Sequence, residues 1–101
     1  MGRFIASVSV VPVGTKTTSL SNYIAQAIKV LQKLGINFEL TPMSTIMSCD
    51  NLDTLFLAIK EIHDELVKQG VSRLVISIDI DARHDKPRTS KDKVKSVMEK
   101  L

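Results

Sequence analysis

The alternation of apolar and polar residues predicts strands in three parts of the chain. A period of two is typical of a strand that has one face against a core, and it occurs in Arg3–Val11, Ile36–Met47 and Val71–Arg83. The middle stretch is interrupted at Pro42, which removes a backbone donor and favours a turn. We therefore expect this stretch to form a β-hairpin. Its residues expected to face the core are Ile36, Phe38 and Leu40.

Two helices are predicted between these strands, because apolar residues recur there every three or four positions. The first helix runs from Leu20 to Leu34 and is followed by Gly35, a residue type that commonly ends helices. Thr18 or Ser19 is expected to cap its start, since a side-chain hydroxyl can accept a hydrogen bond from an unpaired backbone N–H. The second helix is capped by Asp50 or Asn51 and ends at Gly70. The apolar stripe of the second helix is expected to consist of Leu52, Leu55, Phe56, Ile59, Ile62 and Leu66.

A third and shorter helix is predicted for Ser90–Leu101, with Thr89 or Ser90 as its cap. Its apolar residues are Val94, Val97, Met98 and Leu101, and lysines occupy much of the remainder. So small an apolar stripe is expected to pack loosely on its own chain or against a neighbouring subunit.

The order strand, helix, strand, strand, helix, strand predicts an α+β fold of the ferredoxin-like type. Right-handed β-α-β crossovers place both helices on one face of an antiparallel four-stranded sheet. Residues 1–101 are expected to form a single βαββαβ domain with a short C-terminal helix. The opposite face of the sheet, called the open face below, has no covering element. Its expected residues are Ile5, Ser7, Ser9, Val11, Asn37, Glu39, Val75, Ser77, Asp79 and Asp81.

The open face mixes small hydroxyl groups with carboxylates, a combination that suits a small, flat, cationic or hydrogen-bonding ligand. Small side chains leave room, and carboxylates compensate positive charge. Two other interpretations stay open at this point. Glu39, Asp79 and Asp81 are also what a half-solvated sheet face needs to remain soluble, and the same face can form a dimer contact with the ligand between subunits.

No catalytic or metal-binding constellation is legible in the sequence. His63 lies at the edge of the second helix's stripe, where a partly buried histidine bonded to backbone or carboxylate is the ordinary interpretation. His84 has only Asp81 and Asp85 near it, which is a weak metal signal. Asp79 and Asp81 lack a nucleophile to serve. We expect no enzyme activity, no metal and no cofactor.

The basic residues are concentrated at the C-terminal end of the chain. The formal charge is +3, and from Arg83 onward there are seven lysines and arginines against three acids. A nucleic-acid ligand is not expected, because the open face has no aromatic residue on which bases can stack and lysines alone give weak, salt-sensitive binding. The expected role of Arg83, Lys86 and Arg88 is pairing with Asp81, Asp85 or another subunit's acids.

Composition points to an oligomer in a reducing compartment. Hydrophobic residues make up 44% of a short chain, so apolar surface left at Ile5, Val11, Val75 and the third helix is expected to be covered by other subunits. Cys49 is the only cysteine, which favours the cytoplasm. No apolar run reaches the roughly 18 residues of a membrane span, so no membrane association is expected.

Four short motifs follow one another along the chain. They are Pro12-Val13-Gly14-Thr15, Thr41-Pro42-Met43-Ser44-Thr45, Ile80-Asp81-x-Arg83-x-Asp85-Lys86 and Lys93-Val94-x-Ser96-Val97. In these motifs the chain resembles the small thiamine-binding protein family over nearly its whole length. The resemblance implies a ferredoxin-like fold, a homotetramer built as a dimer of dimers, and binding of thiamine or its hydroxymethylpyrimidine part without catalysis.

Two hypotheses for the function follow. In the first, a thiamine-like ligand lies between subunits against the hairpin and the open face, with Phe38 taking part if it lines the edge of the pocket. The other expected contacts are Ser7, Ser9, Glu39, Thr41, Ser44 and Thr45. In the second, the chain is a regulatory or scaffolding module that uses the open face and the basic tail to contact another protein.

Overall fold

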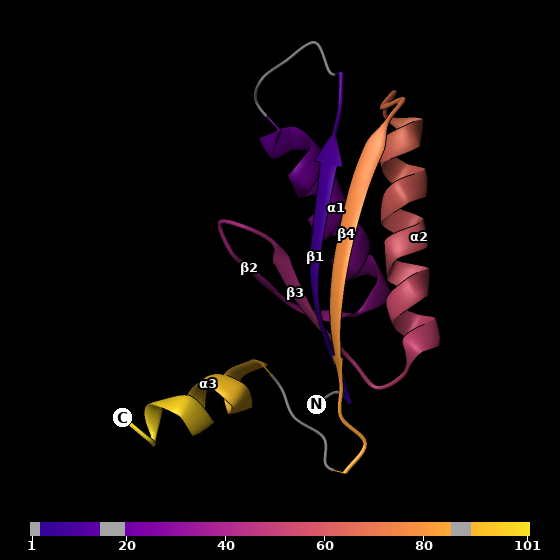
Figure 1. Ribbon diagram of the computed structural model, residues 1–101. Coiled ribbons are helices and arrows are strands. Elements are labelled where there is room, and N and C mark those ends of the chain that lie inside the picture. Colours follow the sequence, from indigo (N-terminus) through magenta and orange to yellow (C-terminus); the bar gives the residue numbers. More distant parts are fainter. Residues whose placement is uncertain (1–2, 15–19, 86–89) are drawn as a thin grey trace.

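The computed structural model describes residues 3–14, 20–85 and 90–101, which form seven elements in chain order. The elements are β1 (Phe4–Pro12), α1 (Ser21–Leu34), β2 (Asn37–Leu40), β3 (Thr45–Cys49), α2 (Leu52–Lys68), β4 (Leu74–Ala82) and α3 (Ser90–Met98). The strands form one antiparallel sheet in the order β2-β3-β1-β4. Both crossover helices cover the same face of the sheet (Figure 1). The predicted ferredoxin-like α+β fold is confirmed.

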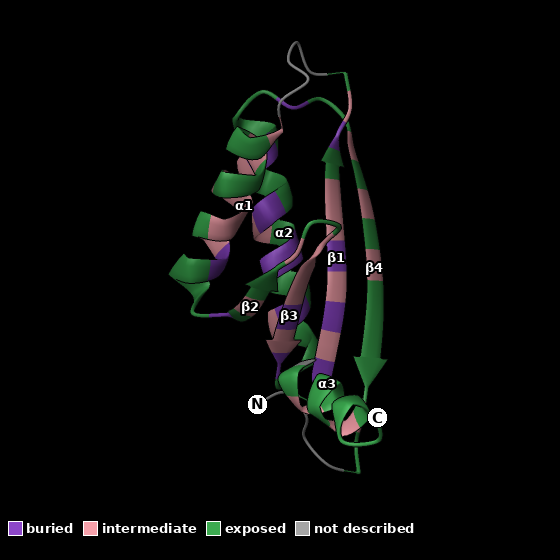
Figure 2. Cartoon of the chain, turned by 90° about the vertical axis from the view of Figure 1, so that its left-hand side faces the viewer, coloured by how far each residue is buried: buried purple, intermediate pink, exposed green. Residues whose placement is uncertain are grey.

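The core lies between the sheet and the two crossover helices. The strands contribute Ala6, Val8 and Met47, all nearly inaccessible to solvent. In Figure 2 the buried residues form a band along β1 and along the inner side of α2. The largest side chains that are fully buried are Leu31, Met47, Leu55, Ile62 and Leu66. One layer of helices packed on one sheet is therefore enough to bury the apolar face of each strand and helix.

The apolar stripe of α2 is narrower than the sequence suggests. Leu55, Ile59, Ile62 and Leu66 are buried, as expected, and Ala58 joins them. Leu52 and Phe56, in contrast, remain 39% and 49% exposed, so the prediction that they belong to the buried stripe is wrong. Each residue turns a helix by about 100°, which rotates Phe56 away from Leu55, and Leu52 lies in the first turn.

Two of the predicted helix boundaries are confirmed and one is not. The Asn51 side chain accepts a hydrogen bond of 2.8 Å from the backbone N–H of Thr54 and caps α2. Gly35 ends α1 with φ of +69°, a left-handed conformation that glycine adopts without strain. The N-cap of α1 is Leu20, without a side-chain hydrogen bond; Thr18 and Ser19, the expected caps, lie outside the described part of the chain.

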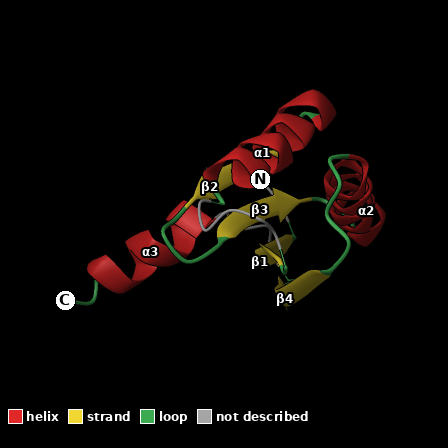
Figure 3. Ribbon diagram, turned by 90° about the horizontal axis from the view of Figure 1, so that it is seen from above, coloured by secondary structure: helices red, strands yellow, loops and turns green. Residues whose placement is uncertain are grey.

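The C-terminal helix stands apart from the sandwich. It extends from the sheet on the side opposite α2, as the view from above shows (Figure 3). Lys93 of α3 pairs with Asp81 at the end of β4. The apolar residues of this segment are exposed, namely Val94, Val97, Met98 and Leu101. The structure therefore shows α3 packed only loosely on its own chain, which is one of the two arrangements that the sequence predicted. Thr89, one of the two expected caps, is not described.

No helix in the described ranges is both long enough and apolar enough to cross a membrane.

Candidate ligand-binding site

The two strands that pair with β1, namely β3 and β4, differ in length. On one side β4 pairs with the whole strand, from Phe4 opposite Ala82 to Pro12 opposite Leu74. On the other side β3 pairs only from Phe4 opposite Cys49 to Val8 opposite Thr45. In the described part of the chain, residues 9–12 of β1 thus have no strand beside them on the β3 side. We call this space, beyond the end of β3 and beside residues 9–12, the notch.

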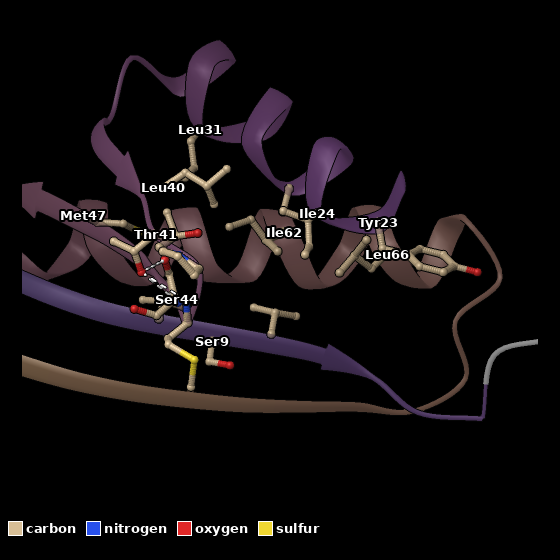
Figure 4. A pocket seen from close by; sticks show the side chains of 16 residues that line it. Ser9, Tyr23, Ile24, Leu31, Leu40, Thr41, Ser44, Met47, Ile62 and Leu66 are labelled. Carbon is tan, nitrogen blue, oxygen red and sulfur yellow. Dashed lines mark hydrogen bonds between the residues drawn. The ribbon is translucent and has the colours of Figure 1, made fainter. Parts of the chain in front are cut away.

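A cavity of about 110 Å³ occupies the notch and continues beneath α1 (Figure 4). Its floor is apolar and consists of Leu31, Met47, Ile62 and Leu66. Tyr23 and Ile24 of α1 form another wall, and residues 41–45, between β2 and β3, close the end nearest the hairpin. In Figure 4 the Tyr23 ring lies at the end of the cavity away from that turn. Among the described residues, no charged side chain lines this cavity.

The turn between β2 and β3 is held by the hydroxyl group of Thr41. This hydroxyl donates to the backbone oxygen of Ser44 at 2.8 Å and accepts from the backbone N–H of Ser44 at 3.1 Å. It also accepts a longer bond of 3.3 Å from the backbone N–H of Met43. The Thr41 N–H in turn donates to the Ser44 oxygen at 2.9 Å. The turn is therefore fixed by its own residues.

One further hydrogen bond joins this turn to the open face. The Ser7 hydroxyl of β1 donates to the Ser44 hydroxyl at 2.8 Å. Ser7 lies opposite Asp79 on one side and Ile46 on the other, and Ile46 lies opposite Glu39. The strand register thus places four residues in one row across the open face, and Ser7 links this row to the turn. The row consists of Glu39, Ile46, Ser7 and Asp79. The next row joins Asn37, Ser48, Ile5 and Asp81, so Ile46 and Ser48 also belong to the open face although the sequence analysis did not include them.

Four of the seven predicted contact residues line the cavity: Ser9, Thr41, Ser44 and Thr45. Ser7 is one hydrogen bond away, through Ser44. Phe38 and Glu39 do not line the cavity; Phe38 packs against the core and Glu39 is on the open face. The cavity therefore includes the turn but lies mainly on the helix side of the sheet.

Sequence reasoning missed Tyr23 and Ile24 of α1 and Val10 of β1 as residues of the cavity. Tyr23 and Ile24 come from the first turn of α1, and Val10 from the end of β1. Tyr23 precedes Ala27 by four residues, so helical spacing places it beside the apolar stripe and offered a usable signal. Leu40, expected in the core, is 56% exposed and also borders the cavity.

Several of the described ionisable groups form pairs outside the cavity. Lys60, hydrogen-bonded at 2.8 Å, and then His63, at 2.9 Å, lower the pKa of Asp64. His63 is half exposed, more than expected, but its partner is a carboxylate as predicted. Arg83 donates to Asp85 at 2.6 and 3.0 Å, which confirms that expected pair.

Other candidates from the sequence have structural partners or lie outside the described part. The His84 and Phe4 rings form a T-shaped contact, with ring centres 5.7 Å apart. Lys86 and Arg88 are not described. Among the described residues there is no group of three or more histidines, cysteines and acids that could hold a metal ion.

Fold and site together define a ferredoxin-like α+β protein with a small cavity at an interior position of the sheet, where β3 is shorter than its neighbour β1, and with no charged lining residue in the described part of the chain. Residues 6–98 match the family model described as thiamine-binding protein. The chain therefore belongs to the thiamine-binding protein family, as the sequence motifs indicated.

Several known proteins are similar to this chain over nearly its full length. A UPF0045 protein of Methanothermobacter thermautotrophicus is 40% identical, covering 95% of this chain and 97% of its own. A hypothetical protein of Methanocaldococcus jannaschii has a crystal structure that matches with a TM-score of 0.83 at 36% identity, over 95% of this chain and 96% of its own. A Thermotoga maritima protein proposed to act in thiamine biosynthesis or salvage matches with a TM-score of 0.74 at 23% identity, over 93% and 97%. This last likeness concerns the fold alone.

Proposed function

We propose that this protein binds thiamine, or the hydroxymethylpyrimidine part of thiamine, without converting it chemically. The observation that carries the proposal is the cavity in the notch, which is apolar below, has hydroxyl groups at the turn and lacks a charged lining residue in the described part. This cavity occurs in a member of the thiamine-binding protein family. An uncharged, partly aromatic cavity suits a neutral flat ring.

The size of the cavity supports a site that is completed by a second subunit. Its volume of about 110 Å³ is closer to a cavity of about 150 Å³ that holds one benzene ring than to the roughly 300–1,000 Å³ of typical ligand pockets. Thiamine has two rings, an aminopyrimidine and a positively charged thiazolium. One ring fits the cavity, and the other lies outside it, where another subunit can cover it.

The distribution of charge favours the neutral ring as the one inside. Burying a cation without a partner is costly, and no charge lines the described cavity wall. The turn is linked through Ser7 to the row of the open face that carries Glu39 and Asp79. The thiazolium ring directed toward that row would meet carboxylates, so pyrimidine inside and thiazolium outside is the arrangement we propose.

The subunit arrangement that we propose is a homotetramer built as a dimer of dimers, each chain forming one domain. Exposed apolar residues support it, because Val11 and Val75 face each other across two strands and are 42% and 45% exposed. Light scattering at working concentration should give about four times the chain mass of 11.2 kDa. A monomeric mass would refute the proposal. The single cysteine supports a reducing compartment, and we propose the cytoplasm.

Titration calorimetry tests the ligand directly. Thiamine and hydroxymethylpyrimidine are expected to bind, and the isolated thiazole part is expected to bind much more weakly, because it lacks the ring that enters the cavity. Ile24→Trp, which fills the cavity wall, should abolish binding. Val67→Trp is the matched control, since Val67 is also a half-exposed helix residue but does not line the cavity. No heat with millimolar thiamine or hydroxymethylpyrimidine would contradict the proposal.

A second candidate function rests on the exposed apolar residues of α3. A short helix with Val94, Val97 and Met98 about 60% exposed can dock on another protein, which makes a scaffolding or regulatory module the alternative. A stoichiometric partner in a pull-down that is lost on Val97→Asp, together with no effect of thiamine on the melting temperature, would favour this alternative.

A further inference from the structure

The direction of the backbone groups in β1 follows from two hydrogen bonds at the ends of the β1–β4 ladder. Val13 N–H donates to Arg73 O at 2.9 Å, and Arg83 N–H donates to Arg3 O at 2.9 Å. Successive residues of a strand direct their N–H and C=O groups to alternate sides. Since residues 3 and 13 face β4, the odd-numbered residues of β1 face β4 and the even-numbered residues face β3.

This alternation leaves Val10 facing the notch. Phe4, Ala6 and Val8 face β3, opposite Cys49, Met47 and Thr45. Continued by two residues, the register would place Met43 opposite Val10, but the chain has already turned at residues 41–44. Among the residues that the structure describes, neither the N–H nor the C=O of Val10 has a backbone partner on this side. Both groups are thus directed toward the notch, and Val10 is one of the residues that line the cavity.

We propose that the backbone N–H and C=O of Val10 recognise the ligand, which takes the place of the missing residue of β3. The part of the ligand inside the cavity is then a neutral, flat, single ring whose edge has a hydrogen-bond donor beside an acceptor, such as an amino group next to a ring nitrogen. Its donor bonds to the Val10 oxygen, and its acceptor receives the Val10 N–H. This inference rests on the proposed function and specifies how the same site selects its ligand.

The lining of the cavity supports this recognition mode independently. Val8 and Val10 belong to the helix side of the sheet, whereas Ser9 belongs to the open face, yet all three line the cavity. A space that touches both faces of one strand reaches the edge of that strand, where its backbone groups lie. The Thr41 hydroxyl, in contrast, is already engaged within the turn, so it is less available to a ligand than the backbone of Val10.

Two ligands that differ in one group test the proposal. Titration calorimetry compares 4-amino-5-hydroxymethyl-2-methylpyrimidine with the same ring without its amino group. Removing the donor leaves a buried carbonyl without a partner, so affinity should fall about ten- to hundredfold. Equal affinity for both rings overturns the proposal. If neither ring nor thiamine binds at all, the proposed function itself falls, and this inference falls with it.

Amide hydrogen exchange locates the contact on the unaltered protein. Without ligand, the Val10 amide should exchange faster than the Val8 amide, which faces Thr45 of β3 and serves as the control. Saturation with the aminopyrimidine should slow exchange at Val10 at least tenfold and shift its NMR resonance, with little change at Val8. Binding of the ring with no change at Val10 overturns this inference and leaves the proposed function standing.

A proline substitution provides a second, independent measurement. Val10→Pro removes the N–H but keeps a side chain of similar size, and proline is tolerated where a strand has no neighbour to bond. The variant should bind the aminopyrimidine at least tenfold more weakly, whereas Val10→Ile, which keeps the N–H, should retain most of the affinity. Unchanged affinity in a folded Val10→Pro protein overturns the proposal; if the variant does not fold, the exchange experiment decides.

Discussion

The two ends of the β1–β3 ladder are built differently, although the same two strands form both. At the Cys49 end, Phe4 and Cys49 face each other and are buried, with Leu55 nearby in the core. At the Thr45 end, β3 stops while β1 continues, and a cavity takes the place of packed side chains. The difference shows that a cavity forms where one strand is shorter than its neighbour, even though the core beside it is well packed.

The largest effect is expected from truncating leucines of α2 near the two ends. Leu55 and Leu66 are both fully buried, but only Leu66 lines the cavity. Leu55→Ala should lower the free energy of unfolding by about 2–5 kcal/mol. Leu66→Ala should cost less, because part of its side chain already faces the cavity. Chemical denaturation measures both, and a larger loss for Leu66→Ala would contradict the contrast between the ends.

Proline substitutions in β1 compare paired and unpaired backbone positions. Val8→Pro deprives the ladder of the N–H that faces Thr45, whereas Val10→Pro removes an N–H that faces the notch. Val8→Pro should therefore be less stable than Val10→Pro by about 1–3 kcal/mol, the cost of an unpaired buried group. Thermal or urea unfolding monitored by circular dichroism gives the difference. Equal stabilities would mean that Val10 is paired after all.

The Ser7–Ser44 hydrogen bond is expected to matter less. Ser44→Ala and Ser7→Ala should each lower the free energy of unfolding by about 0.5–1.5 kcal/mol. The double variant should be little worse than either single variant, since both remove the same bond. Ser77→Ala is the control, because Ser77 is also a hydroxyl residue of the open face but lies on β4, opposite Ser9. Fully additive losses would show that the two hydroxyls act separately.

The smallest effect is expected for the thiol group of Cys49, at the Cys49 end of the β1–β3 ladder. Burial, and to a lesser degree the charge of Asp50, raise the pKa of Cys49. A raised folded pKa stabilises the protein fully below the ordinary thiol pKa of about 8.5, and this stabilisation is lost as the pH rises through the folded value. Iodoacetamide at pH 8 should accordingly alkylate Cys49 more slowly in folded than in urea-unfolded protein.

A cysteine introduced at the Thr45 end of the ladder provides the matched comparison for the Cys49 thiol. Ser44→Cys in a Cys49→Ser background places the thiol at the turn, where it is part-buried and borders the cavity. It should react faster than Cys49 does in the unaltered protein. Similar rates at both positions would show that the two ends are equally closed to the reagent.

The architecture could be predicted from sequence because it depends on the order and period of its elements. Alternation in three stretches and two helical stripes leave few topologies, and the crossover rule selects one. Details set by position within an element were harder. Asn51 was one of two predicted caps and is the one used, but Phe56 satisfied helical spacing and is still half exposed, because spacing defines a stripe without its width.

The candidate site could be predicted only in part for a related reason. Alternation tells which face a residue is on, so the hydroxyls at 7 and 9 and the turn residues could be proposed. It does not tell how far the neighbouring strand extends. That β3 begins only at Thr45, opposite Val8, while β1 continues to Pro12 is a property of the pairing, and Val10 and Tyr23 become cavity residues only because of it.

The turn that Thr41 holds together has a consequence for how the family can diversify. Its hydrogen bonds involve the Thr41 side chain and the backbone, so the side chain of Met43, 86% exposed and on the rim of the cavity, contributes little to the shape of the turn. Mutation can therefore change the chemistry of this rim while the fold stays intact. Under the proposed function, substitutions at position 43 would alter ligand preference with little loss of stability.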